Sequence, residues 1–496
     1  ILSVQGRPHS VQVSYLKEPC QEYVRAALEA VEDIRRSDVP GDILVFLTSQ
    51  EECERAVDWI KTQDHHEDAD RDGRRTGRDR RDRRDQRDQR DQREHRHQRL
   101  HAVALYAGLP TKHQLAVFEA PPRGQRKVVF ATNIAETSLT IDGIAHVVDP
   151  GFSKQASYNP RSGMAALTVA PISRASAQQR AGRAGRTGPG KCFRLFTAWS
   201  YAHELEENTV PEIQRTNLGS VVLQLKALGI HDLVGFDFMD PPPPASLVRS
   251  LEQLYALGAL NDRGALTKLG RRMAELPVDP MLGKFLVAAG DAGCGEEAVT
   301  IAAMLGVGGS VLYRPKDRAL HADAAHAAFS AGGVGDHIAL LNVYNGWAGS
   351  GYSASWCAES YVQPRAMARA RDVRDQLSGL MARIEAPLAS AGGDWDLVRK
   401  TLTAGFFYHT ARLGRGGGYR TLKAPPQAVA LHPSSALAAP GVPAPRWVLY
   451  HELVLTSREF MRTVSEIKPG WLVEVAPHYY SAGEVVEEEG GRKGKK

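Results

Sequence analysis

Residues 43–60, ILVFLTSQEECERAVDWI, decide the fold of this chain, because one structural pattern gives way to another within them. The first five positions are an unbroken apolar run, which is typical of a strand buried on both faces. Ser49, with Glu52 three positions later, forms a capping box that predicts the start of a helix. Apolar residues then recur at helical spacing and predict one buried helix face: Cys53, Ala56, Val57 and Ile60.

The same strand-then-helix pattern recurs as far as about residue 200. Apolar runs at 102–106, 128–131 and 146–148 are each followed by a turn and a helix-favouring stretch. Strands that alternate with helices pair in parallel, and the helices cover both faces of the sheet. We therefore predict a doubly wound α/β domain over residues 1–200.

Composition limits the class of function. The 496 residues are 43% hydrophobic with a net charge of +5, which fits several domains and permits a nucleic-acid partner without requiring one. No apolar run approaches the roughly 20 residues that span a bilayer, so no membrane partner is expected. The five cysteines form no CxxC pair, so no metal site or disulfide framework is expected, and a reducing nuclear or cytosolic compartment is indicated.

An Arg/Asp-rich segment interrupts the α/β domain between about 64 and 99. Its arginines and acids nearly cancel in charge, and it offers nothing from which to build a core, so we predict a disordered insertion. A solvated surface loop is one interpretation of this insertion. A segment that binds RNA or partner proteins is the other.

The rest of the chain changes character three times. Short amphipathic helices split by a run of prolines predict a winged-helix domain over 201–277, and an Ala-rich, helix-favouring region predicts a helical bundle over 278–392. Over 393–482, short apolar runs such as 447–450 and 471–475 alternate with Gly and Pro and predict a small β-barrel. The polar tail, 483–496, is predicted to be disordered.

The sharpest chemical signal is the segment 179–186, QRAGRAGR. On a helix, Gln179, Arg183 and Arg186 would share one face, whereas Arg180 would point elsewhere. The two glycines would let that face approach another surface closely.

Two guanidinium groups and an amide aimed at one point suit the oxygens of a transferring phosphoryl group, which is the arginine-finger arrangement. The alternative is a solvated basic helix or a patch that binds an RNA backbone. Glycines inside a helix are costly unless they serve a purpose, which favours the phosphoryl interpretation.

Polar residues also follow two of the predicted strands. The segment 131–143, ATNIAETSLTIDG, would place hydroxyls, an amide and carboxylates at the carboxyl edge of the sheet, where α/β domains bind ligands. An ordinary polar loop is the alternative. Thr48 and Ser49 follow the first predicted strand. Free hydroxyls and backbone amides at this position suit a phosphate of a nucleic-acid backbone. Capping of the next helix is the alternative explanation for both residues.

Together these segments resemble the second RecA-like domain, and everything after it, of the DEAH-box/RNA helicase A-like family of helicases. The resemblance covers almost the whole chain except the insertion and the tail, and it is greatest to the subgroup linked to pre-mRNA splicing. Ser49 departs from the family pattern, which has Gly there. The matching segments are 44–52 (motif IV), 131–144 (motif V), 179–186 (motif VI), 147–154 and 158–161 (a hairpin), 210–230 (winged helix), 335–347 (ratchet bundle) and 445–467 (OB-like barrel).

The resemblance implies an α/β RecA-like parallel-sheet domain followed by winged-helix, helical-bundle (ratchet) and OB-like β-barrel domains. It implies Arg183 and Arg186 as arginine fingers and Gln179 near the γ-phosphate or attacking water of ATP. Two further sets of roles come with it. The residues near the nucleotide would be Phe118, Thr140 and Asp142, and those on the nucleic-acid backbone Thr48, Ser49, Thr132, Asn133 and Lys154. An alternative for Phe118 is an ordinary core residue.

The family also implies ATP with Mg²⁺, RNA as partner, ribonucleoprotein components such as those of the spliceosome, and an activating protein. It implies a nuclear location, with a cytoplasmic one as the alternative. The sequence has no P-loop: its nearest string, 188–192 (GPGKC), lacks the hydroxyl for Mg²⁺ and opens a predicted strand. We therefore expect an ATP-dependent RNA helicase whose phosphate-binding domain lies outside this chain, and no ATPase activity from this chain alone. The alternative is a non-catalytic RNA- or protein-binding module derived from a helicase.

Overall fold

The computed structural model describes most of the chain in two compact units. The first comprises residues 1–155 and 168–210, and the second 156–167 and 211–496. The described residues are 9–37, 39–75, 99–109, 111–137, 139–160, 163–307, 310–315, 318–330, 333, 335–422, 426–456 and 458–486, without the side chains of 64–75, 111–113, 165 and 484.

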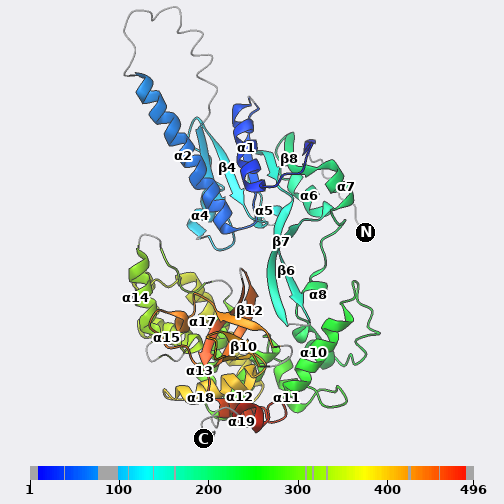
Figure 1. Cartoon of the computed structure of the whole chain (residues 1–496), viewed down its shortest axis with the longest axis vertical. Helices are drawn as coiled ribbons and strands as arrows, with labels where there is room; N and C mark the ends of the chain where they lie inside the picture. The colour runs from blue at the N-terminus through cyan, green and yellow to red at the C-terminus, as the bar shows by residue number, and fades with distance from the viewer. Residues whose placement is uncertain are drawn as a thin grey trace, which may run out of the picture. The chain divides into compact units, whose positions relative to one another are not determined.

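The first unit is built on a six-stranded parallel sheet in the order β1-β8-β5-β2-β4-β3. Figure 1 labels two of these strands, β4 and β8. The strands run in chain order as β1 (Val11–Leu16), β2 (Asp42–Phe46), β3 (Arg99–Leu105), β4 (Gln125–Ala131), β5 (Ile144–Asp149) and β8 (Gly190–Thr197). Each predicted apolar run lies in one of these strands, which confirms the parallel α/β prediction.

Helices cover both faces of this sheet because alternate strand residues are apolar on each side. α1 (Tyr23–Arg36) and α2 (Gln50–Arg75) share a core with Ile43, Val45 and Phe130. On the other face, α5 (Ile134–Thr137) and α6 (Arg174–Ala181) share a core with Leu44, Phe46 and Val129. The short helices α4 (Thr111–Ala116) and α7 (Ala198–His203) complete the unit.

The start of α2 confirms half of the predicted capping box. The Ser49 hydroxyl accepts a hydrogen bond from the Glu52 backbone at 3.2 Å. The Glu52 carboxylate reaches one residue further back than predicted, to the backbone N–H of Thr48 at 2.8 Å. The predicted buried face of this helix is confirmed, since Cys53 and Ile60 are buried.

α2 continues to Arg75, well into the segment that was predicted as a disordered insertion. The rest of that insertion, 76–98, lies outside the described residues, and β3 begins at Arg99.

β6 (Phe152–Asn159) and β7 (Met164–Pro171) are neighbouring strands that span both units. Within the second unit, β7 pairs in parallel with β12 (Trp447–Leu455) through Ala165 and Ala166.

Helices dominate the second unit. In chain order they are α8 (Glu212–Arg215), α9 (Gly219–Ala227), α10 (Pro244–Ala256), α11 (Lys268–Ala274), α12 (Pro280–Ala292), α13 (Gly295–Gly306), α14 (Ala319–Phe329), α15 (Asp336–Gly349), α16 (Ala354–Glu359), α17 (Pro364–Arg383) and α18 (Trp395–Phe406). None of the helices in the described part of the chain is long and apolar enough to cross a membrane.

A closed barrel follows α18, in the order β13-β11-β10-β9-β12 with β12 pairing back to β13. Its strands are β9 (Thr410–Leu413), β10 (Tyr419–Thr421), β11 (Ala428–Leu431), β12 and β13 (Glu459–Glu466), with a 3-10 turn, η2 (Ala436–Ala438), between β11 and β12. This architecture, with the helical region before it, confirms the predicted fold class. The predicted domain boundaries stay predictions.

The C-terminal residues correct two expectations. The apolar run 471–475 was grouped with the barrel but lies in α19 (Pro469–Val475), because Pro469 opens a helix and a short apolar run has no period of its own. The tail was predicted as disordered from residue 483, yet α20 (Ala482–Val486) continues to Val486 and buries Val485. Residues 487–496 lie outside the described residues.

Candidate functional site

The site is built around the end of α6. Ser173 caps this helix by accepting a hydrogen bond from the Ser176 backbone at 3.1 Å, and Gly182 occupies the C-cap position. Arg183 and Arg186 therefore follow the helix in a turn, and the prediction that they share a helix face with Gln179 is wrong. Gln179 is exposed in the last turn of α6.

In this turn Gly185 approaches β1 closely. Its carbonyl accepts a hydrogen bond from His9 at 3.0 Å. A Cβ at this position would lie 2.7 Å from the His9 carbonyl oxygen and 2.7 Å from the Val11 side chain. The predicted close approach is thus correct for Gly185, although the surface that it meets is a strand of its own domain.

Both candidate arginines bind the loop that follows α5. The Arg183 guanidinium donates to the Leu139 carbonyl at 3.2 Å, and that of Arg186 donates to the Thr140 hydroxyl. Asp142 is exposed two residues further on. Tertiary structure therefore brings together Arg183, Arg186, Thr140 and Asp142, which the sequence places in two separate motifs.

The electrostatics of this arginine pair favour an anion. Burial lowers the pKa of Arg183, and the neighbouring charge of Arg186 lowers it further. Two adjacent guanidinium groups repel one another, and a negatively charged ligand relieves that repulsion. The pair can thus stabilise negative charge that develops on a phosphoryl group.

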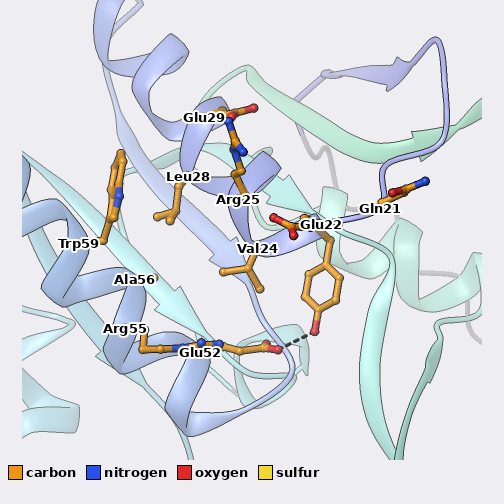
Figure 2. Close-up of a pocket in the computed structure, with 11 residues that line it drawn as sticks. Gln21, Glu22, Val24, Arg25, Leu28, Glu29, Glu52, Arg55, Ala56 and Trp59 are labelled. Atoms are coloured by element: carbon orange, nitrogen blue, oxygen red, sulfur yellow. Dashed lines mark hydrogen bonds and ion pairs between the residues drawn. The ribbon is translucent and has the colours of Figure 1, made fainter.

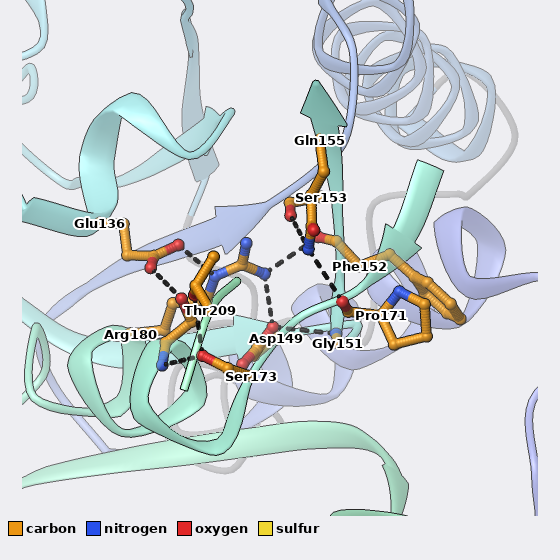
Figure 3. A network of polar contacts seen from close by, with 11 residues as sticks. Glu136, Asp149, Gly151, Phe152, Ser153, Gln155, Pro171, Ser173, Arg180 and Thr209 are labelled. Carbon is orange, nitrogen blue, oxygen red and sulfur yellow. Dashed lines mark hydrogen bonds and ion pairs between the residues drawn. The ribbon is translucent and has the colours of Figure 1, made fainter. Parts of the chain in front are cut away.

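Arg180 has a different role, as its position on the predicted helix indicated. It is buried, and its Nε donates to Glu136 of α5 at 3.0 Å (Figure 3). Its Nη1 donates to Asp149 at 2.8 Å and to the Phe152 carbonyl at 3.1 Å. Sequence reasoning did not find Glu136 or Asp149, because nothing in the sequence indicates which carboxylates meet a given arginine.

The carboxyl ends of β2 and β4 meet at one edge, since Phe46 pairs with Ala131 in the parallel register. The predicted contacts Ser49, Thr132 and Asn133 follow these strand ends, and Asn133 is exposed. Lys154 in β6 is also exposed. The pKa of Glu51 is lowered by hydrogen bonds at the start of α2 and then by the charge of Lys154, which puts Lys154 near that helix end.

Thr48 does not offer the free hydroxyl that the sequence suggested. It is buried, and its hydroxyl donates to Glu52 at 2.9 Å. The Tyr23 hydroxyl donates to the other oxygen of Glu52 at 2.6 Å and lies 3.2 Å from the Thr48 hydroxyl. The Glu52 carboxylate therefore occupies the Thr48 hydroxyl, which it reaches because Glu52 lies four residues later, one helical turn away.

Tyr23 and Glu52 also line an open groove of about 700 Å³ between α1 and α2. Its floor is apolar, with Val24, Leu28 and Trp59 facing the gap (Figure 2). None of the predicted site residues lines this groove.

Phe118 lies just beyond α4 and is 43% exposed, while the preceding Val117 is buried. The alternative that Phe118 is a core residue is therefore wrong, and its ring is available to a ligand.

Comparison with protein-family models gives four matches. The model of the helicase conserved C-terminal domain matches residues 81–188. Two models of the helicase-associated domain HA2 follow, the winged-helix part at 250–278 and the ratchet-like part at 279–340. An oligonucleotide/oligosaccharide-binding (OB) fold model matches 398–479. These helicase and OB-fold matches suggest nucleic-acid binding.

Proposed function

We propose that this chain, whose four matched domains indicate a DEAH/RHA-type helicase C-terminal region, is the part of an ATP-dependent RNA helicase that supplies the arginines for hydrolysis and one surface for the RNA. The observation that carries the proposal is the convergence of Arg183 and Arg186 on one loop, through Leu139 and Thr140.

The residues present fit one side of a nucleotide. Arg183 and Arg186 would contact the phosphates, Asp142 the ribose, and the exposed ring of Phe118 the base. Bound ATP with Mg²⁺ supplies the phosphoryl group to be transferred. The arginines hold positive charge where negative charge develops, and Gln179 orients water from the exposed turn of α6.

RNA would lie along the edge formed by the carboxyl ends of the strands. Asn133 and Lys154 are exposed there and would contact the backbone, with Ser49 and Thr132 beside them. Thr48 would take part only if Glu52 released its hydroxyl. We propose remodelling of RNA or ribonucleoprotein in pre-mRNA splicing, and hence a nuclear protein. The five free cysteines fit a reducing compartment, nuclear or cytosolic.

RNA-stimulated ATP hydrolysis tests the proposal. We expect no turnover from this chain alone, and turnover when a separately purified P-loop domain of a DEAH helicase is added. Arg183→Ala or Arg186→Ala should then reduce turnover by roughly 10³-fold or more while RNA affinity is retained. Arg25→Ala is the matched control, because Arg25 is exposed and pairs only locally with Glu29.

Each outcome has a clear meaning. Turnover by the chain alone that Arg186→Ala abolishes would contradict the expectation of a separate phosphate site. RNA binding without turnover in any mixture would favour the non-catalytic binding module instead. Copurification from whole-cell extract tests the splicing role: we expect pre-mRNA processing complexes, and the recovery of only cytoplasmic partners would refute it.

A further inference from the structure

The guanidinium of Arg180 joins parts of the first unit that are distant in sequence. Its hydrogen bonds reach Glu136 in α5, Asp149 at the end of β5 and the Phe152 carbonyl at the start of β6. Its centre also lies 4.6 Å from the centroid of the Phe46 ring in β2. Figure 3 shows both carboxylates turned toward this one side chain.

Each partner is held a second time, which fixes its direction. The other oxygen of Glu136 accepts a hydrogen bond from the Ser176 hydroxyl at 2.5 Å. The Asp149 oxygen that meets Arg180 also accepts from the Gly151 backbone at 2.9 Å. These contacts connect α5, α6 and the turn between β5 and β6 through charges that are buried at Arg180 and Asp149 and 12% exposed at Glu136, so solvent compensates them little.

The connected segments are those that carry the proposed chemistry. Glu136 precedes the loop of Leu139 and Thr140, to which the candidate arginines bind. Phe152 opens β6, the strand that carries Lys154. The Phe152 ring contacts the Tyr23 ring with their centroids 5.3 Å apart, and Tyr23 donates to Glu52 at the start of α2.

We propose that Arg180 is a positioning residue, which locks the loop at 139–143, the turn at 150–153 and the arginine turn at 183–187 into one body. A shift of β6 on binding nucleic acid is then transmitted to the arginines that face the nucleotide. The contacts of Arg180 do not depend on the proposed function. The claim that a shift of β6 reaches the arginines through them rests on the proposed function.

Amide hydrogen exchange of the full chain tests the lock without requiring enzymatic activity. Arg180→Lys keeps the charge but can satisfy fewer partners, so exchange should become about 10- to 100-fold faster in all three segments. Glu54→Gln is the matched control. Glu54 on α2 accepts hydrogen bonds from the Tyr106 hydroxyl at 2.8 Å and the Gln50 side chain at 2.9 Å, away from the three segments, so those segments should keep their rates.

Two isosteric variants distinguish positioning from general support of the fold. Glu136→Gln removes one arm and should speed exchange at 139–143 more than at 150–153. Asp149→Asn should show the reverse. Arg180→Lys with unchanged rates, or isosteric variants that loosen the whole sheet evenly, would overturn the proposal, and the isosteric pair decides the matter if Arg180→Lys does not fold.

Oligouridylate added to the wild-type chain tests the transmission. We expect slower exchange near Lys154 and also at 183–187, with the second effect lost in Arg180→Lys. Protection near Lys154 alone would overturn the transmission. An absence of any protection by RNA would refute the proposed RNA surface instead, while the exchange pattern of the variants would still test the lock.

Discussion

Acidification should weaken the second unit through two histidines, His337, which is buried, and His409, which is partly buried. His337 in α15 is fully buried and hydrogen-bonds through Nδ1 to the Ser465 hydroxyl at 2.9 Å. Burial lowers its pKa from 6.5 to about 3, and the charge of His451 lowers it further. His409 lies against Tyr450, and burial likewise lowers its pKa to about 4.

Acid destabilises the fold if the unfolded chain binds protons more readily than the folded protein does. Below pH 6.5 the unfolded chain protonates both histidines, while the folded protein keeps them neutral until the pH nears their lowered pKa values. Stability is therefore present above about pH 6.5 and is lost as the pH falls. Between pH 7 and pH 5 each histidine should remove about 2 kcal/mol from the free energy of unfolding.

Urea denaturation at pH 7 and pH 5, followed by tryptophan fluorescence, measures this change. Trp447 in β12 and Trp471 in α19 are buried reporters in the same unit. His337→Gln should make the acid-induced loss smaller by about 2 kcal/mol, whatever the variant does to stability at pH 7. His203→Gln is the control, because His203 is exposed. An acid-induced loss of the same size in wild type and His337→Gln would refute the reasoning.

Three further predictions concern the first unit. Gly185→Val should lower its free energy of unfolding by about 1–3 kcal/mol, because the new Cβ would lie 2.7 Å from the His9 carbonyl oxygen; unchanged thermal unfolding would contradict this. Tyr23→Phe removes the hydrogen bond to Glu52 and should cost about 1–2 kcal/mol in urea denaturation, and a neutral result would mean that this bond adds nothing. Phe118→Ala should change stability by less than about 0.5 kcal/mol, since the ring is 43% exposed, yet weaken binding of a fluorescent ATP analogue in the reconstituted helicase; a large loss of stability would restore the core interpretation.

The local sequence pattern predicted the structure correctly where hydrophobic burial dominates. The apolar runs of β2, β3, β4 and β5 can be buried only between two helical layers, so the sequence predicted the parallel sheet that the structure has. Helical spacing likewise predicted the buried face of α2. Where several weak preferences compete, the sequence prediction failed, as for the short apolar run that lies in α19.

The candidate site was likewise predicted only in part from the sequence. The sequence identified Arg183 and Arg186 as important residue types but placed them on a helix that ends at Ala181. In the turn that carries them, Gly185 meets β1, a contact between segments far apart in the chain. Thr48 was predicted as a free hydroxyl, and only the orientation of Glu52 determines that it is not.

By itself, then, the sequence determined strands β2 to β5, the buried face of α2 and the residue types available for phosphate chemistry, because these follow from hydrophobic period and side-chain chemistry along a short stretch. The tertiary structure decided which charges meet. Arg180 pairs with Glu136 and Asp149, and Arg186 reaches Thr140, only because the parallel strands bring their loops to one edge of the sheet. Burial there makes each unpaired charge costly, so the folded arrangement, rather than the local sequence, selects its partners.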